Sequence, residues 1–209
     1  RICYVNKMDR IGANFAHCVK GIRERLGANA LLCQVPLGSS DEFVGMADLV
    51  AGVGYIWASD DKDSVWESVP LEQLKDRLKF GSDADNAWIA DLPRLREDLL
   101  ESALALDDDA FEHLINTGEF DPAVLKRCIR KGTVTGELVP VLCGSSYKNK
   151  GVQQLLDAVV DYLPYPGENG GIAMVDEDGN VVGEQAVTDD APARALAFKV
   201  INDQFGTLT

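Results

Sequence analysis

Three polar residues follow an apolar run at the start of the chain and have the types and spacing needed to bind a purine base. The run Ile2 to Val5 predicts a strand, and Asn6, Lys7 and Asp9 come directly after it. The carboxylate of Asp9 can accept hydrogen bonds from guanine N1–H and the N2 amine together, whereas adenine has no donor at either place. Asn6 can bond both the base and the loop backbone, and the stem of Lys7 can lie against the ring face. The pattern predicts a guanine-reading loop at the carboxyl end of a strand, where open α/β sheets bind ligands.

A second loop of suitable chemistry follows another apolar run, at residues 138–143. This Gly/Ser loop spans residues 144–151 and precedes a segment, 152–163, with apolar residues at helical spacing. Such a loop offers backbone N–H groups and a hydroxyl to an acceptor such as guanine O6. Taken alone, each loop is also compatible with an ordinary polar turn or a plain strand-to-helix connection. We expect both to serve one site because two such loops rarely coincide by accident.

The elements between and around these loops are predicted from periodicity and from turn residues. Helices are predicted at residues 14–26, from about 70 to 78, 92–106, from Asp107-Asp108-Asp109 onward and 123–130. Strands are predicted at 31–37 and 193–202, and residues 43–49 and 54–59 are expected to form two further short strands or a strand and a turn. The three aspartates are interpreted as a helix start rather than a metal or acid–base site, because carboxylates favour helix N-termini. Residues 168–171 are expected to form a linker and residues 176–180 a hairpin turn.

Composition narrows the classes of partner. With 34 acidic and 20 basic residues the formal net charge is −14, which argues against strong direct binding of nucleic acid by this segment. An acidic surface suits a basic protein partner, or simply solubility. No apolar run approaches membrane-spanning length, so we expect no membrane partner. His17 and His113 are isolated, and a metal role is not expected for them.

The cysteines show no metal-binding or redox spacing. They fall mostly in apolar stretches, which predicts buried, reduced thiols of a cytosolic protein. These cysteines are Cys3, Cys18, Cys33, Cys128 and Cys143.

Five segments closely resemble the bacterial elongation factor G family, densely at both ends of the chain and thinly in the middle. They are residues 5–10, 25–29, 143–153, 155–164 and 195–200. That family is a ribosomal translocase, a GTPase that moves tRNA and mRNA through the ribosome. The resemblance implies that Asn6, Lys7 and Asp9 read the base of GTP or GDP. It further implies that Ser145 and Ser146 belong to the second guanine loop. The family usually has Gly-Ser-Ala-Phe there, so Ser146 and Tyr147 depart from its pattern; Ser146 should be tolerated because the implied contact is a backbone amide.

The resemblance also implies the fold class and the division into domains. The expected α/β fold is the carboxyl-terminal part of a P-loop GTPase domain with an α+β inserted subdomain, followed by the first strands of a β-barrel domain. Residues 1–30 and 137–166 are assigned to the GTPase domain. Residues 31–136 are assigned to the insertion, and residues 167–209 to a linker and the truncated start of the barrel.

The sequence contains no Gly-x-x-x-x-Gly-Lys-[Ser/Thr] phosphate loop and no Asp-x-x-Gly ahead of a switch helix. We therefore interpret it as a piece of a larger protein whose other residues bind the phosphates and Mg²⁺. Alone, it is expected to be inactive in GTP hydrolysis. The implied partners are the ribosome and the ribosomal stalk protein, which the insertion would face, and the implied location is the cytoplasm.

Two other functions remain open from the sequence. Peptide chain release factor three is a related translational GTPase that also carries an insertion at this place, although the run from Gly144 to Gln153 favours the translocase. From a different class, the chain could be a non-catalytic interaction module that keeps a guanine-site fold and binds only protein. A phosphate loop upstream would favour an enzyme over the module.

Overall fold

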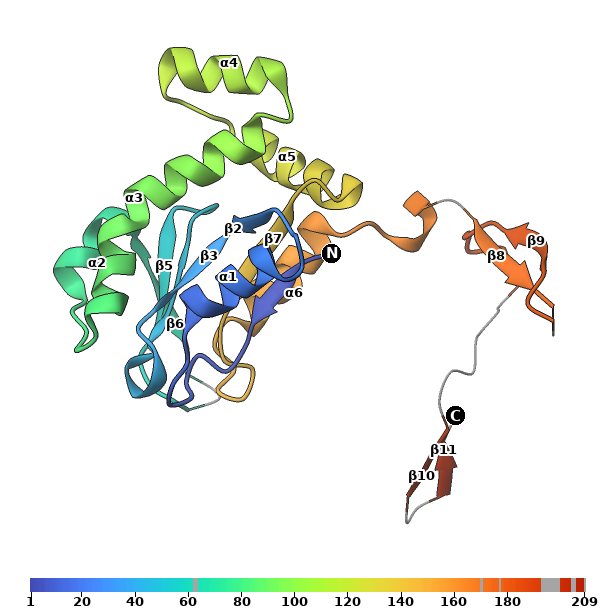
Figure 1. Cartoon of the computed structure of the whole chain (residues 1–209), viewed down its shortest axis with the longest axis horizontal. Helices are drawn as coiled ribbons and strands as arrows, with labels where there is room; N and C mark the ends of the chain where they lie inside the picture. The colour runs from blue at the N-terminus through green and yellow to red at the C-terminus, as the bar shows by residue number, and fades with distance from the viewer. Residues whose placement is uncertain (62–63, 170, 177, 193–199, 204–205, 209) are drawn as a thin grey trace. The chain divides into compact units, whose positions relative to one another are not determined.

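The computed structural model divides the chain into two compact units, Arg1–Leu163 and Pro164–Thr209 (Figure 1). Each unit is described by itself. The structure describes residues 1–61, 64–169, 171–176, 178–192, 200–203 and 206–208. The sequence-based division into four parts, with boundaries after residues 30, 136 and 166, stays a prediction.

A three-stranded parallel sheet forms the centre of the first unit. Its strands are β1 (Cys3–Val5), β7 (Val139–Cys143) and β2 (Ala30–Leu32), in the order β1-β7-β2. Helix α1 (Phe15–Glu24) connects β1 to β2, and helix α6 (Val152–Tyr162) follows β7. This parallel sheet, with helices following two of its strands, confirms the α/β character predicted from the sequence. Because β1 and β7 pair in parallel, the loops that follow them emerge at the same edge of the sheet.

A four-stranded antiparallel sheet continues from the parallel one. It contains β3 (Gln34–Leu37), β4 (Gly45–Asp48), β5 (Val53–Trp57) and β6 (Trp66–Pro70) in sequence order. The single strand predicted at 31–37 is divided at Cys33. The N–H of Cys33 donates to Val141 O at 3.0 Å, whereas its carbonyl accepts from Leu49 N at 2.9 Å, so the chain changes partner strands there. Strand β6 was not predicted, because Val69 is the only one of its residues that is buried.

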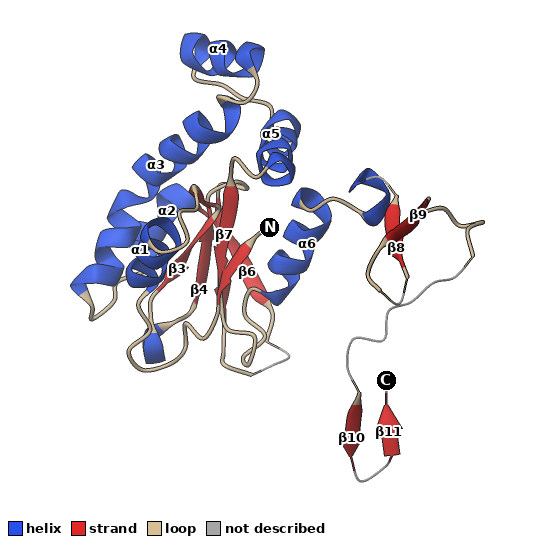
Figure 2. Ribbon diagram, turned by 45° about the vertical axis from the view of Figure 1, so that its right-hand side comes forward, coloured by secondary structure: helices blue, strands red, loops and turns tan. Residues whose placement is uncertain are grey.

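Four further helices belong to the first unit: α2 (Leu71–Arg77), α3 (Asp83–Leu104), α4 (Asp108–Thr117) and α5 (Pro122–Thr135). Helices α2, α3 and α5 pack beside the sheets, whereas α4 packs against α3. In Figure 2, α1 and α3 lie on one side of the strands and α5 and α6 on the other. The predicted start of α4 is confirmed, since the Asp107 side chain accepts from Ala110 N at 3.1 Å. No helix in the described part of the chain is long and apolar enough to span a membrane.

Helix α3 is longer than predicted because packing outweighs local propensity. It begins at Asp83 rather than Leu92, after Ser82 caps its first turn by accepting from Asp85 N at 3.3 Å. Pro93 lies inside the helix and has no N–H to donate to the preceding turn. The helix continues through it because Ile89 and Leu92 are buried before Pro93 and Leu95 is buried after it.

The expectation of buried cysteines is only partly correct. Cys33, Cys128 and Cys143 are buried, but Cys3 is half-buried and Cys18 is exposed. Burial raises the pKa of the Cys33 and Cys143 thiols, which keeps both in the neutral form. Cys18 is exposed because α1 buries only Phe15 and Val19.

In the second unit, β8 (Ile172–Val175) and β9 (Val181–Gln185) form the predicted hairpin, whose turn is closed by the Asp176 carboxylate accepting from Asn180 N at 2.9 Å. A 3₁₀ turn, η2 (Pro166–Asn169), occupies part of the predicted linker. Strands β10 (Ile201–Asp203) and β11 (Gly206–Leu208) pair antiparallel. Most of the strand predicted at 193–202 falls on 193–199, which lie outside the described residues. The start of a β-barrel stays a prediction.

Candidate functional site

The two loops singled out in the sequence meet in the structure through Asn6 and Ser146, which are 140 positions apart. The Asn6 carboxamide oxygen accepts from the Ser146 backbone N–H at 3.0 Å and lies 3.1 Å from the Ser146 hydroxyl. The Asn6 amide nitrogen donates to that hydroxyl at 2.8 Å. Asn6 therefore bonds the loop backbone, as predicted, and its partner is the second loop.

Backbone contacts hold the same two loops together. The Gly144 N–H donates to Val5 O at 3.1 Å, and the Met8 N–H donates to Gly144 O at 3.1 Å. A Cβ at Gly144 would lie 2.3 Å from both Lys150 O and the Tyr4 hydroxyl. Glycine is thus required at this position, because Lys150 and Tyr4 approach the backbone too closely for any side chain.

Lys7 has a left-handed backbone conformation, with φ of 63°. Residues other than glycine seldom adopt this region, and such strain is concentrated at functional sites. The Lys7 N–H donates to the Asn6 side chain at 2.7 Å, which offsets part of the cost. The turn leaves the Lys7 side chain exposed and places Met8 in the core.

One carboxylate oxygen of Asp9 accepts no hydrogen bond from the described residues. This atom, Oδ1, is also shielded from solvent. A shielded carboxylate oxygen without a donor is costly, and native structures seldom leave one without a reason. The two oxygens of the Asp9 carboxylate are acceptors of the kind that the two N–H donors on the edge of a guanine base require. The residues present therefore fit a guanine nucleotide.

The sequence reasoning missed Met8 and Ser40, which support the first loop. Met8 is 1% exposed, and its carbonyl accepts from the Ser40 N–H at 2.9 Å. The Ser40 hydroxyl donates to Arg10 O at 3.1 Å. Ser40 lies in the short 3₁₀ turn η1 (Ser40–Glu42), for which the sequence showed only a turn signal. Met8, which lies between Lys7 and Asp9, therefore anchors the first loop in the core.

The second loop is closed by a pair of hydrogen bonds between Ser145 and Lys150. Each donates its backbone N–H to the carbonyl of the other at 2.9 Å, and the Lys148 N–H donates to the Ser145 hydroxyl at 3.3 Å. Ser145 is fully buried and its N–H is engaged, so it supports the loop from within. The Ser146 N–H, which the resemblance directs to guanine O6, donates to Asn6 in this structure.

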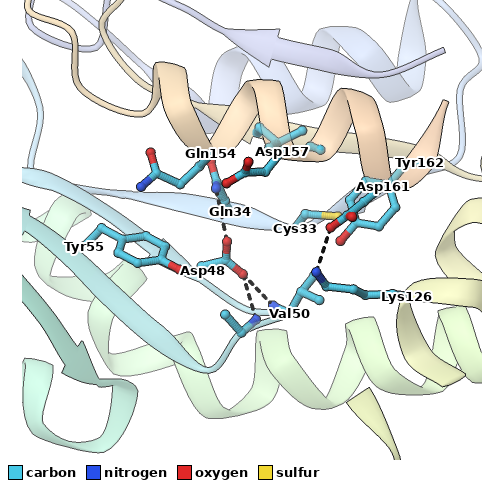
Figure 3. A pocket seen from close by; sticks show the side chains of 13 residues that line it. Cys33, Gln34, Asp48, Val50, Tyr55, Lys126, Gln154, Asp157, Asp161 and Tyr162 are labelled. Atoms are coloured by element: carbon cyan, nitrogen blue, oxygen red, sulfur yellow. Dashed lines mark hydrogen bonds and ion pairs between the residues drawn. The ribbon is translucent and has the colours of Figure 1, made fainter. Parts of the chain in front are cut away.

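A polar cavity of about 110 Å³ lies elsewhere, between α6 and the antiparallel sheet (Figure 3). The Asp48 carboxylate there accepts from Val50 N at 3.0 Å, Ala51 N at 2.8 Å and the Gln34 side chain at 3.2 Å. Burial raises the pKa of Asp48, although these hydrogen bonds oppose the shift. None of the five predicted site residues lines this cavity, and the role of Asp48 is to close the turn after β4.

Comparison with known protein families gives one match over most of the chain. The family described as the elongation factor Tu GTP-binding domain matches residues 1–165. A crystal structure from Thermus thermophilus is similar with a TM-score of 0.60 and 24% sequence identity, covering 81% of this chain and 23% of that one. At that identity the structural likeness supports the fold alone.

Several relatives named elongation factor G are similar along the whole chain. That of Orientia tsutsugamushi (strain Boryong) is 42% identical over 212 residues, covering 100% of this chain and 28% of the relative. That of Gluconobacter oxydans is 39% identical and is covered over 29% of its length. One from Methylococcus capsulatus, named elongation factor G 1, is 43% identical and is covered over 28%. The chain thus spans less than a third of the length of these relatives.

Proposed function

Because this chain belongs to the elongation factor Tu GTP-binding domain family and is an elongation factor G homologue over its full length, we propose that it forms the guanine-reading part of a translational GTPase. In this proposal Asp9 accepts from the base, and Asn6 fixes the second loop against the first. The stem of Lys7 covers the ring, and Ser145 and Ser146 shape the second loop. The observation that carries the proposal is the shielded, unpartnered Oδ1 of Asp9 beside the Asn6–Ser146 contact.

The nucleotide would be held here by its base alone. When bound to the full-length protein, GTP supplies the phosphoanhydride bond that is hydrolysed. Residues outside this sequence would bind its phosphates and Mg²⁺. This agrees with the coverage of the relatives, since the chain spans only 28% of the length of the one from Orientia tsutsugamushi. The side chains described here select the base and orient it. We assign them no catalytic role.

We assign the full-length protein to ribosomal translocation in the cytoplasm, with the ribosome as its partner. The relatives named elongation factor G, at 39 to 43% identity, support the translocase over a release factor or a binding module. The antiparallel sheet and helices α2 to α5 would form the inserted subdomain that faces the ribosomal stalk protein. The charge of −14 suits a basic protein surface better than RNA.

We expect the full-length protein to hydrolyse GTP when ribosomes are added, and the 209-residue chain to release no phosphate under the same conditions. The physical reason is that phosphoryl transfer depends on groups that position the γ-phosphate and the attacking water. Phosphate release measured with and without ribosomes checks both parts. A full-length protein that stays inactive with ribosomes would contradict the translational assignment.

We expect the C-terminal domain of the ribosomal stalk protein to bind this chain and to shift NMR signals within residues 31–136. The binding should weaken as salt rises from low to moderate concentration, because exposed charges are screened over about 10 Å at 0.1 M salt. Signals from α1 serve as an internal control and should stay in place. Absence of binding at low salt would overturn the stalk assignment without affecting the guanine site.

A further inference from the structure

One carboxylate beyond the antiparallel sheet contacts two lysines of the second guanine loop. Asp60 follows β5, and its Oδ1 accepts from the Lys150 ammonium at 2.8 Å. Its Oδ2 pairs with the ammonium of Lys148. Asp60 and Lys150 are 90 positions apart in the sequence, so the contact links two separate parts of the first unit. We call the three residues Asp60, Lys148 and Lys150 the carboxylate clamp.

The buried lysine makes this clamp different from an ordinary surface ion pair. The Lys150 side chain is 2% exposed, whereas that of Asp60 is 60% exposed. Exposed pairs contribute little, but an ammonium that has lost its water depends on the partners it retains. Besides Asp60, the Lys150 ammonium donates to Phe43 O at 3.2 Å and lies 5.9 Å from the centre of the Phe43 ring. Asp60 is thus the anionic partner of a buried cation.

A continuous series of contacts leads from the clamp to the base-reading residues. The Lys150 backbone forms the paired hydrogen bonds with Ser145, and its carbonyl also accepts from the Tyr4 hydroxyl at 3.3 Å. Ser145 precedes Ser146, whose N–H donates to Asn6. Contacts that hold the Lys150 side chain in place therefore also hold the loop segment that presents Ser146 to Asn6.

We propose that Asp60 is a positioning residue through which the antiparallel sheet holds the loop from Ser145 to Lys150 in its base-reading form. The proposal rests on the guanine assignment above. Asp60 acts through Lys148 and Lys150 and is not assigned any contact with the nucleotide. Hydrogen bonds from these two lysines hold the pKa of the Asp60 carboxyl below its usual range, so it is ionised at neutral pH.

The test compares Asp60→Asn with Asp61→Asn, which removes the same charge one position along the same loop. Asp61 accepts from the Ser59 hydroxyl at 3.1 Å and contacts neither lysine in the described contacts. Because Asp60 is exposed, Asp60→Asn should fold. We expect this variant of the 209-residue chain to exchange the Ser145 and Ser146 amide hydrogens about tenfold faster, whereas Asp61→Asn leaves them unchanged.

In the full-length protein we expect Asp60→Asn to weaken GDP binding by about tenfold, within the usual range of coupling between sites. Binding of GDP should be unchanged in Asp61→Asn. Asp60→Glu keeps the charge and should recover most of the lost affinity, which a simple loss of packing would not allow.

Wild-type amide exchange and wild-type GDP affinity in Asp60→Asn would overturn the proposal, and equal effects of Asp60→Asn and Asp61→Asn would also overturn it. Failure of the guanine assignment has a different signature, because Asp9→Ala would then leave nucleotide preference unaltered. In that case the amide exchange of the isolated chain still decides whether Asp60 holds the loop.

Discussion

Substitution of Asp9 by alanine in the full-length protein is expected to weaken GDP binding by about 10²- to 10⁴-fold, since each of two hydrogen bonds to a charged acceptor contributes about 1.5–3 kcal/mol. Affinity for ADP, which is weak from the start, should stay unchanged because adenine presents no donor to this carboxylate. The shielded Oδ1 of Asp9 without a described partner is the structural basis of this expectation. Equilibrium titrations with fluorescent GDP and ADP analogues give both affinities.

The variant Asp9→Asn is the matched control, because it keeps the size and shape of the side chain. Its amide can still accept from N1–H but presents a donor where the carboxylate accepted from the N2 amine. Xanthine has a carbonyl at that place, so Asp9→Asn should prefer XDP over GDP. Equal losses of GDP and ADP affinity in Asp9→Ala would contradict the base-reading role of Asp9.

Substitution of Met8 by alanine is expected to lower the free energy of unfolding of the first unit by about 2–5 kcal/mol. Met8 is 1% exposed, so its removal leaves a cavity under the base-reading motif. The first unit contains all three tryptophans, Trp57, Trp66 and Trp88, and their fluorescence in urea therefore reports on its unfolding. The loss should appear as a lower urea midpoint with an unchanged slope.

Two variants control for the Met8 experiment. Met8→Leu conserves volume and should cost less than about 1.5 kcal/mol. Lys7→Ala alters an exposed neighbour in the same turn and should change the free energy of unfolding by no more than about 0.5 kcal/mol. If Met8→Ala were as stable as Lys7→Ala, Met8 would not be the anchor of the loop.

The amino-acid sequence was sufficient to locate the two loops and the parallel α/β framework. Asn6 and Asp9 stood out in the sequence because the base reading proposed for them depends on the side-chain chemistry of adjacent residues. Helix α1 followed from the helical spacing of apolar residues within 14–26, and the start of α4 followed from the carboxylates that begin at Asp107. Such features involve neighbours in sequence, and their physical causes can be read without the fold.

Only the tertiary structure decided what holds the loops in place. The contacts between Asn6 and Ser146, between Met8 and Ser40, and between Asp60 and Lys150 join distant positions. The two loops were expected to serve one site, but no periodicity or motif marks the individual contacts that hold them. The division of one predicted strand at Cys33 had the same origin, since the change of partner strand depends on Val141 and Leu49. Local chemistry thus identified the groups that we propose read a base, whereas packing between remote segments determines how those groups are held.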